Sequence, residues 1–278
     1  QGGDGWFHNY FSYDRRLLPE ERSEDCQGRA LWALATTGRI WHQQPLAQVA
    51  LRMFSQSLPT WQQMRSIRGL SLVIIALATL LRSIPSLGTA DCSWELPEQL
   101  VAEYRATAGS GWYWYENILA YSCGLMPAAL FHAYGVTERK DYLKVGLDSL
   151  NFLSDITVTG GIFQPIGNRG WYPRDGKKAQ YDQQPLEGWA LTLAGTAAFM
   201  ATQNRSWLDL ADSAERWYLG QNQLKVPLYD ARTGGCSDGL HPAGVSENQG
   251  AESSLAYVLT RSLQQRVRSG VQIEAQEA

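Results

Sequence analysis

The sequence has few of the residues that carry metal and redox chemistry. Among 278 residues there are four histidines and four cysteines, with no CxxC pair and no zinc-type spacing. It also contains no GxSxG, P-loop, HExxH or GxGxxG pattern. We therefore predict neither a metal nor a cofactor. Cys26 and Cys123 stand in apolar helical patterns, where a thiol packs as a small hydrophobe, which favours a reducing, cytoplasmic location.

Charge and long hydrophobic runs are also scarce. Charged residues make up 18% of the chain, and a net charge of -3 with a pI near 5.9 argues against nucleic acid as a partner. The longest apolar run, Leu70 to Leu81, is too short to cross a bilayer, so we expect a buried helix and no membrane span. The first residues, QGGDGWFHNY, do not have the pattern of a signal peptide.

Aromatic residues, in contrast, are abundant. Apolar residues reach 44%, enough for a sizeable core, and the chain has eleven tryptophans and thirteen tyrosines. Several of these stand in polar loops. That combination is typical of saccharide-binding clefts, because the apolar face of a pyranose stacks on an aromatic ring.

Helical patterns dominate, and they alternate between two kinds. The spacing predicts helices near 23–38, 44–57, 60–82, 94–108, 113–134, 138–155, 184–203, 206–222 and 249–267. Every second one is small-residue-rich and nearly uncharged after its first turn, whereas those between them carry a charged face. Inner and outer helices in turn predict an all-α, (α/α)n toroid of five to six hairpins, a single domain over 1–278 with long loops at one end.

The starts of the predicted inner helices repeat one kind of chemistry. Four of the five combine carboxylates with amides, and in a ring of hairpins all inner helices start at the same end. Each carboxylate alone suits a helix cap. Taken together they predict a polar cleft for glycosidic-bond chemistry, in which one acid protonates the leaving oxygen and another activates water or attacks the sugar. The predicted catalytic residues are Asp25, Glu116, Asp182 and Glu252.

Three loops supply the predicted substrate-binding residues. The stretches GSGWYWYEN, GGIFQPIGNRGWYPRDG and DARTGGCSDGLHPAGVSENQGAE are rich in glycine, aromatic rings and hydrogen-bonding groups, and long loops in compact domains are often functional. A purely structural reading makes them hairpins and lids. The predicted contacts from these loops and the adjacent helix starts are Trp112, Trp114, Asn117, Asn168, Trp171, Arg174, Tyr181, Gln183, His241 and Glu247.

Three long stretches, FHNYFSYDRR…SEDCQGRALWALA, PIGNRGWYPRDGKKAQYDQQPLEGWA and DGLHPAGVSENQGAESSLAYVL, resemble a bacterial family of (α/α)6-toroid proteins. That family is described as glycosyltransferase-associated or glycoside-hydrolase-like, with a six-hairpin glycosidase-like ring. The resemblance implies a saccharide ligand at the end where inner helices start, and a glycosyltransferase partner. The sequence departs from that family in showing only about nine helices, so we expect a ring incomplete on its N-terminal side. The residues that the resemblance places in the cleft are Asp14, Glu24, Asp25, Glu116, Asp182, Gln183 and Glu252.

Three functions remain open on the sequence. A glycoside hydrolase acting on an oligosaccharide or polysaccharide by carboxylate acid/base catalysis is the leading hypothesis. A non-catalytic saccharide-binding domain working with a glycosyltransferase is the second. A sugar epimerase or isomerase is the third, and it requires a histidine as proton carrier, for which His241 is the candidate.

Overall fold

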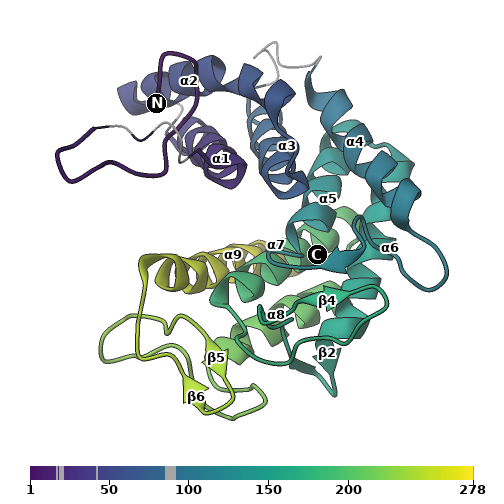
Figure 1. The fold of residues 1–278 in the computed structure, drawn as a ribbon. Helices are drawn as coiled ribbons and strands as arrows, with labels where there is room; N and C mark the ends of the chain where they lie inside the picture. Colours follow the sequence, from purple (N-terminus) through teal and green to yellow (C-terminus); the bar gives the residue numbers. More distant parts are fainter. Residues whose placement is uncertain (17, 19–21, 42, 85–91, 278) are drawn as a thin grey trace. The chain divides into compact units, whose positions relative to one another are not determined.

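The computed structural model describes residues 1–16, 18, 22–41, 43–84 and 92–277, and it is mostly helical (Figure 1). This confirms the predicted all-α class. Over the described residues the α-helices are α1 Glu24–Ile40, α2 Pro45–Ser57, α3 Ile67–Leu81, α4 Cys92–Thr107, α5 Leu125–Thr137, α6 Lys140–Thr157, α7 Pro185–Thr202, α8 Ser206–Tyr218 and α9 Ala251–Glu277. A 3-10 helix, η2 Leu58–Gln63, follows α2 directly.

Local signals set where the helices begin. Ser23 precedes α1, and its hydroxyl accepts a hydrogen bond from the Cys26 amide at 3.1 Å. Ser66 caps α3 in the same way, through the Gly69 amide. Pro45 and Pro185 each stand at the first position of a helix, where a missing N–H costs nothing.

The chain divides into two compact units. The first comprises Gln1–Ala102 with Ala129–Leu143, and the second comprises Glu103–Ala128 with Lys144–Ala278. The chain passes between them inside three helices, α4, α5 and α6.

In the first unit α1 packs against both α2 and α3 (Figure 1). The α1–α3 crossing is close because glycines face each other. A Cβ on Gly28 would lie 2.7 Å from the Gly69 carbonyl oxygen, and one on Gly69 would lie 2.9 Å from the Glu24 carbonyl oxygen. α3 is buried along almost its whole length, as its uninterrupted apolar sequence predicts.

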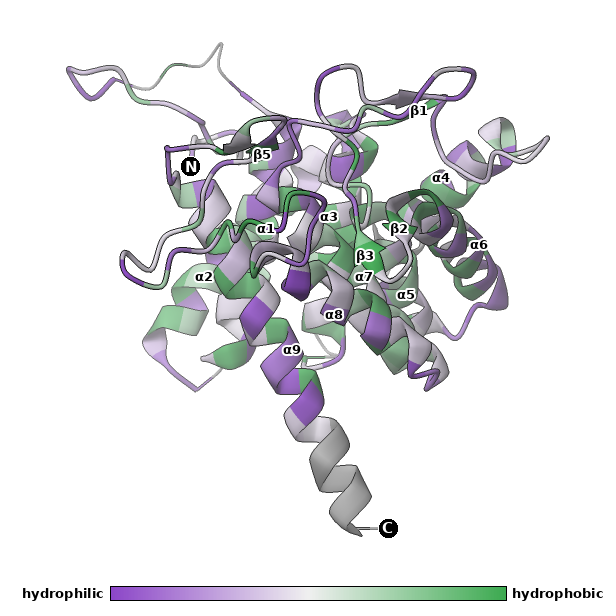
Figure 2. Ribbon diagram, turned by 90° about the horizontal axis from the view of Figure 1, so that it is seen from below, coloured by the Kyte–Doolittle hydropathy of each residue, from purple (hydrophilic) through white to green (hydrophobic). Residues whose placement is uncertain are grey.

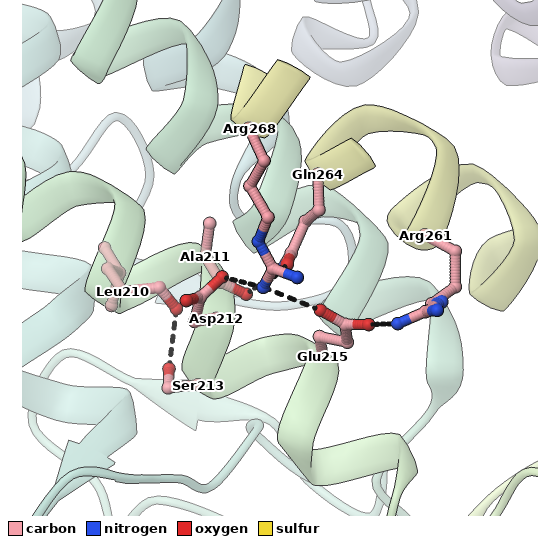
Figure 3. A network of polar contacts seen from close by, with 8 residues as sticks. All are labelled: Leu210, Ala211, Asp212, Ser213, Glu215, Arg261, Gln264 and Arg268. Carbon is pink, nitrogen blue, oxygen red and sulfur yellow. Dashed lines mark hydrogen bonds and ion pairs between the residues drawn. The ribbon is translucent and has the colours of Figure 1, made fainter. Parts of the chain in front are cut away.

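In the second unit α7 packs against both α8 and α9. α7 is buried over nearly all of its residues, whereas α9 shows hydrophilic and hydrophobic patches in turn (Figure 2). A charged network ties α8 to α9 (Figure 3): the buried Glu215 carboxylate is paired with Arg261 and Arg268, and Arg268 also reaches Asp212 at 2.8 Å. Helices two apart in the sequence, α1 with α3 and α7 with α9, therefore pack against each other, as the inner helices of a toroid do.

Short strands fasten the loops of the second unit. β1 Ile118–Leu119 pairs antiparallel with β4 Tyr172–Pro173, β2 Val158–Thr159 with β3 Ile162–Phe163, and β5 Leu240–His241 with β6 Gly244–Val245. The first pair joins segments more than fifty residues apart. The β1 and β4 loops are thereby held against each other.

The predicted helix over 113–134 is wrong in its first half. α5 begins only at Leu125, and the preceding residues run as turns and as β1. Ser122 has φ +51, a left-handed conformation that interrupts a right-handed helix. Trp114 and Tyr115 are buried there as in a helix, which is why the apolar pattern was misleading.

Candidate functional site

In the second unit the starts of α5, α7 and α9 are connected by hydrogen bonds. Glu187, in the first turn of α7, accepts from the amides of Ser122 and Cys123, which precede α5. Gln183, just before α7, exchanges both backbone hydrogen bonds with Leu240, at 3.0 and 2.9 Å. The loops that carry β4 and β5 thus meet at the helix starts of this unit.

The start of α9 is held by Asp238. Its carboxylate accepts from the Gly250 amide at 2.7 Å and from the Asn248 side chain. Burial would raise the pKa of Asp238, but hydrogen bonds from Asn248, Ser253 and the Gly250 amide together lower it. This carboxylate therefore serves as a helix cap.

In the first unit, too, a carboxylate caps the start of a helix. The Glu24 carboxylate accepts from the Arg65 amide at 2.6 Å and from the Ser66 amide, so it caps the start of α3. Asp25 accepts a bond of 3.2 Å from the Ser66 hydroxyl. Asp14 is exposed and is paired with Arg16 at 2.7 Å.

The loop between β3 and α7 doubles back on itself. The Gly167 amide donates to the Ala179 carbonyl at 2.8 Å, and the Ala179 amide donates to the Trp171 carbonyl at 2.9 Å. Lys178 fixes the base of this loop, because its ammonium donates to the carbonyls of Ile156 and Gln164 at 2.9 and 2.6 Å. Burial lowers the pKa of Lys178 to about 8.

Trp171 is the aromatic ring that this loop presents. It is partly exposed, and its centroid lies 6.2 Å from that of Tyr121 at an interplanar angle of 46°. Trp171 has φ +54, which is rare for a bulky side chain. Two further left-handed residues, Ser122 and Asp182, lie in the same part of the unit, since Ser122 follows Tyr121 and the Asp182 carbonyl accepts from the Asn168 amide. Such backbone strain is concentrated at functional sites.

Asp182 is a carboxylate at the end of the same loop. It pairs with Arg169, whose side chain is 81% exposed, while the Asp182 side chain is 20% exposed. Its backbone is held, since its own carbonyl accepts from the Asn168 amide and the next residue, Gln183, pairs with Leu240. Asp182 is therefore a positioned carboxylate whose partner is a single solvent-exposed guanidinium.

Gln183, the residue after Asp182, begins a chain of hydrogen-bonded side-chain amides. Trp217 donates from Nε1 to Gln183 Oε1 at 3.0 Å, and because indole is only a donor, it fixes the orientation of the amide. Gln183 then donates to Gln223 at 2.7 Å, and Gln223 donates to Gln164 at 3.0 Å. Gln183 is fully buried. Its side chain, predicted to contact substrate, is engaged in this network.

An open hollow of about 690 Å³ adjoins β4. It is lined by Asn117, Pro173, Arg174, Asp175 and Gly176. Arg174 shapes it by donating to the carbonyls of Thr107 and Gly109 at 2.9 and 2.7 Å.

The two tryptophans predicted to contact a sugar, which precede the Trp171 loop in the chain, are not exposed. Trp112 and Trp114 are buried. Trp112 packs edge-on against Phe152 and Tyr172 and donates to the Glu116 carbonyl at 2.7 Å. The exposed ring of that stretch is Tyr113. Trp171, in contrast, is partly exposed.

The remaining predicted residues stay at the surface of the second unit. Glu116 and Tyr181 are partly exposed, while Glu247 and Glu252 are exposed. His241 has both ring nitrogens engaged, with Nε2 at 3.2 Å from the Val245 carbonyl and Nδ1 accepting from the Ala243 amide. Among the described residues, no group of three or more His, Cys, Asp and Glu side chains could hold a metal ion.

Glu187, Lys178 and Tyr121 are site-supporting residues that the sequence interpretation missed. Each is now defined by a contact to a distant segment. Glu187 did carry a signal, because a carboxylate in the first turn of an otherwise apolar helix is conspicuous. Its partners, two backbone amides 64 and 65 residues away, leave no trace in the sequence.

The alternating helices define a fold of the (α/α)6-toroid class, and comparison with solved structures shows the same fold. Cellobiose 2-epimerase from Bacillus thermoamylovorans B4167 matches with a TM-score of 0.64 at 11% identity, covering 92% of this chain and 74% of that one. The GH76A α-1,6-mannanase from Salegentibacter sp. HEL1_6 matches with a TM-score of 0.61 at 13% identity, covering 96% and 94%. The fold is therefore shared with carbohydrate-active enzymes.

A third neighbour is the Lin0763 protein from Listeria innocua, with a TM-score of 0.56 at 12% identity over 74% of this chain. The chain spans 60% of the length of that protein. No sequence family and no curated protein matches the chain. Across the described residues, none of the helices is both long and apolar enough for a membrane span.

Proposed function

We propose that this protein cleaves a glycosidic bond in an oligosaccharide or polysaccharide, with the sugar held at Trp171 and Asp182 as a catalytic carboxylate. The observation that carries the proposal is the pairing of a strained, partly exposed indole with a positioned carboxylate on one loop. The ring supplies a stacking face for a pyranose, and the carboxylate activates water or attacks the sugar. Glu116, on the segment paired with β4, is the candidate for the acid.

A test of this proposal uses Asp182→Asn and Trp171→Ala. We expect Asp182→Asn to lower kcat by at least about 100-fold, the usual size of acid–base catalysis, with the fold intact. Trp171→Ala should weaken substrate binding by about tenfold through lost stacking. The substrates are α-1,6-mannan and a panel of neutral oligosaccharides that includes cellobiose. Cleavage is measured by reducing-end assays, and epimerisation of cellobiose is measured by NMR.

Asp155→Asn is the matched control, because Asp155 is an exposed carboxylate of the same unit on the outer helix α6. It should leave turnover unchanged. Equal turnover in wild type and Asp182→Asn would remove Asp182 from the mechanism.

A saccharide-binding domain without turnover is the second candidate. It is favoured by the carboxylates of Glu24, Glu187 and Asp238, all of which are occupied by backbone amides at helix starts. This function would be established if the protein bound the same saccharides without forming product and if Trp171→Ala abolished that binding.

A further inference from the structure

The N-terminal loop of the first unit exposes three aromatic rings within four residues. Tyr10 is 58% exposed, Phe11 65% and Tyr13 106%. Single exposed apolar side chains are common on proteins, but a cluster of large ones marks a binding surface. We call residues Tyr10–Arg16 the aromatic loop.

Hydrogen bonds hold the aromatic loop in one shape. The Ser12 amide donates to the Arg16 carbonyl at 2.9 Å, and the Arg15 amide donates back to the Ser12 carbonyl at 2.9 Å. The Ser12 hydroxyl also accepts from the Arg16 amide at 3.0 Å and donates to the Asp14 carboxylate. Arg15 has φ +62, as the tight turn requires. The rings are therefore presented by a pre-organised turn, which reduces the entropy lost on binding.

The chemistry of the aromatic loop fits a saccharide. Two of the three rings are phenols, which combine an apolar face with a hydrogen-bonding group and lose little side-chain entropy when fixed. Asp14 and Arg16, paired at 2.7 Å and both largely exposed, add the carboxylate and guanidinium that bind sugar hydroxyls. Within residues 10–16 the rings have no aliphatic neighbour, and one carboxylate stands beside the two guanidiniums of Arg15 and Arg16, a mixture of hydrogen-bonding groups suited to sugar hydroxyls.

We infer that the aromatic loop, in the first unit, is a second saccharide-binding site, whereas the Trp171 site belongs to the second unit. This inference rests on the proposed function, and it adds that the ligand is a polymer. A polysaccharide carries repeated sugar units for both sites, whereas a disaccharide fills one site at a time.

The test is a triple variant, Tyr10→Ser with Phe11→Ser and Tyr13→Ser, in the full chain. Binding is measured by affinity electrophoresis in gels containing yeast α-mannan, dextran, xylan or β-glucan. We expect at least about tenfold weaker binding to the retained polysaccharide, from the lost ring contacts, while cleavage or binding of disaccharides at the Trp171 site is unchanged. Circular dichroism checks the fold.

Leu46→Ser with Val49→Ser is the control, because it removes exposed apolar surface from α2 in the same unit. It should bind like wild type. Wild-type-like binding by the triple variant, together with loss in Trp171→Ala, would overturn the aromatic-loop inference and leave the proposed function standing. A wild-type protein that binds none of the polysaccharides or disaccharides would overturn both.

Two other outcomes also overturn the inference. In one, the triple substitution abolishes flotation with phosphatidylserine vesicles but not polysaccharide binding, which identifies a membrane contact. In the other, it changes the molar mass measured by light scattering, which identifies a contact between copies of the chain.

Discussion

At the scale of single residues, a carboxylate near a helix start has two competing uses. Glu187 and Glu24 each accept from two consecutive backbone amides at the start of a neighbouring inner helix. These amides have no partner within their own helix, and at the buried Ser122 and Cys123 the carboxylate satisfies groups that would otherwise lack hydrogen bonds. Asp182 does not cap a helix in this way and keeps an exposed partner.

Glu187→Gln should therefore destabilise the protein. The amide group keeps one acceptor oxygen but turns an NH2 toward a backbone N–H, and the negative charge near the helix start is lost. We expect the free energy of unfolding to fall by about 1–3 kcal/mol, measured by urea denaturation. Glu103→Gln, at an exposed position of α4, is the control. Equal midpoints for the two variants would contradict the capping function of Glu187.

Residue-level prediction from the sequence succeeded where the signal is local. The Ser23 cap and Pro185 at the first turn both follow from neighbouring residues. Only tertiary contacts decide that Trp112 and Trp114 are buried and Tyr113 is not. The burial of Gln183 likewise depends on a partner, Trp217, that is distant in the sequence.

At the scale of elements, most helix positions could be predicted because apolar periodicity is written along the chain. The predicted helix over 60–82 is divided into η2 and α3, and the one over 113–134 shrinks to α5. In the second case apolar residues continue across the break at 118–124, so periodicity alone cannot place that break. Contacts between segments do place it, as the β1–β4 pairing shows.

Gly124→Ala tests how closely α5 and α7 approach. An added Cβ would lie 2.1 Å from the Ala190 carbonyl oxygen, and backbone must move to relieve that overlap. We expect a loss of about 1–3 kcal/mol or more in stability. Gly270→Ala is the matched control, since Gly270 lies within α9 with open space around it. That change should stabilise the helix by about 1 kcal/mol, because alanine is the better helix former. Similar effects of the two changes on the thermal midpoint would argue against a tight α5–α7 crossing.

At the scale of the whole molecule, the fold class was predictable and the division into two units was not. The alternation of buried helices, such as α3 and α7, with amphipathic ones is a property of the sequence, and it suffices to indicate the toroid class that the structural neighbours share. The unit boundary depends on which helices pack most closely. No glycine- or proline-rich linker marks it, because it falls inside helices.

Because the boundary crosses α4, α5 and α6, we predict that residues 1–278 unfold as one cooperative domain. Unfolding one unit alone would require these three helices to end in mid-helix, each leaving amides and carbonyls without partners. Gly28→Ala weakens the first unit at α1–α3, and Gly124→Ala weakens the second. Each variant should shift a single urea transition, with coincident midpoints in tryptophan fluorescence and far-UV circular dichroism. If the transition splits, with each variant moving a different half, the helices do not couple the units and the chain consists of two domains.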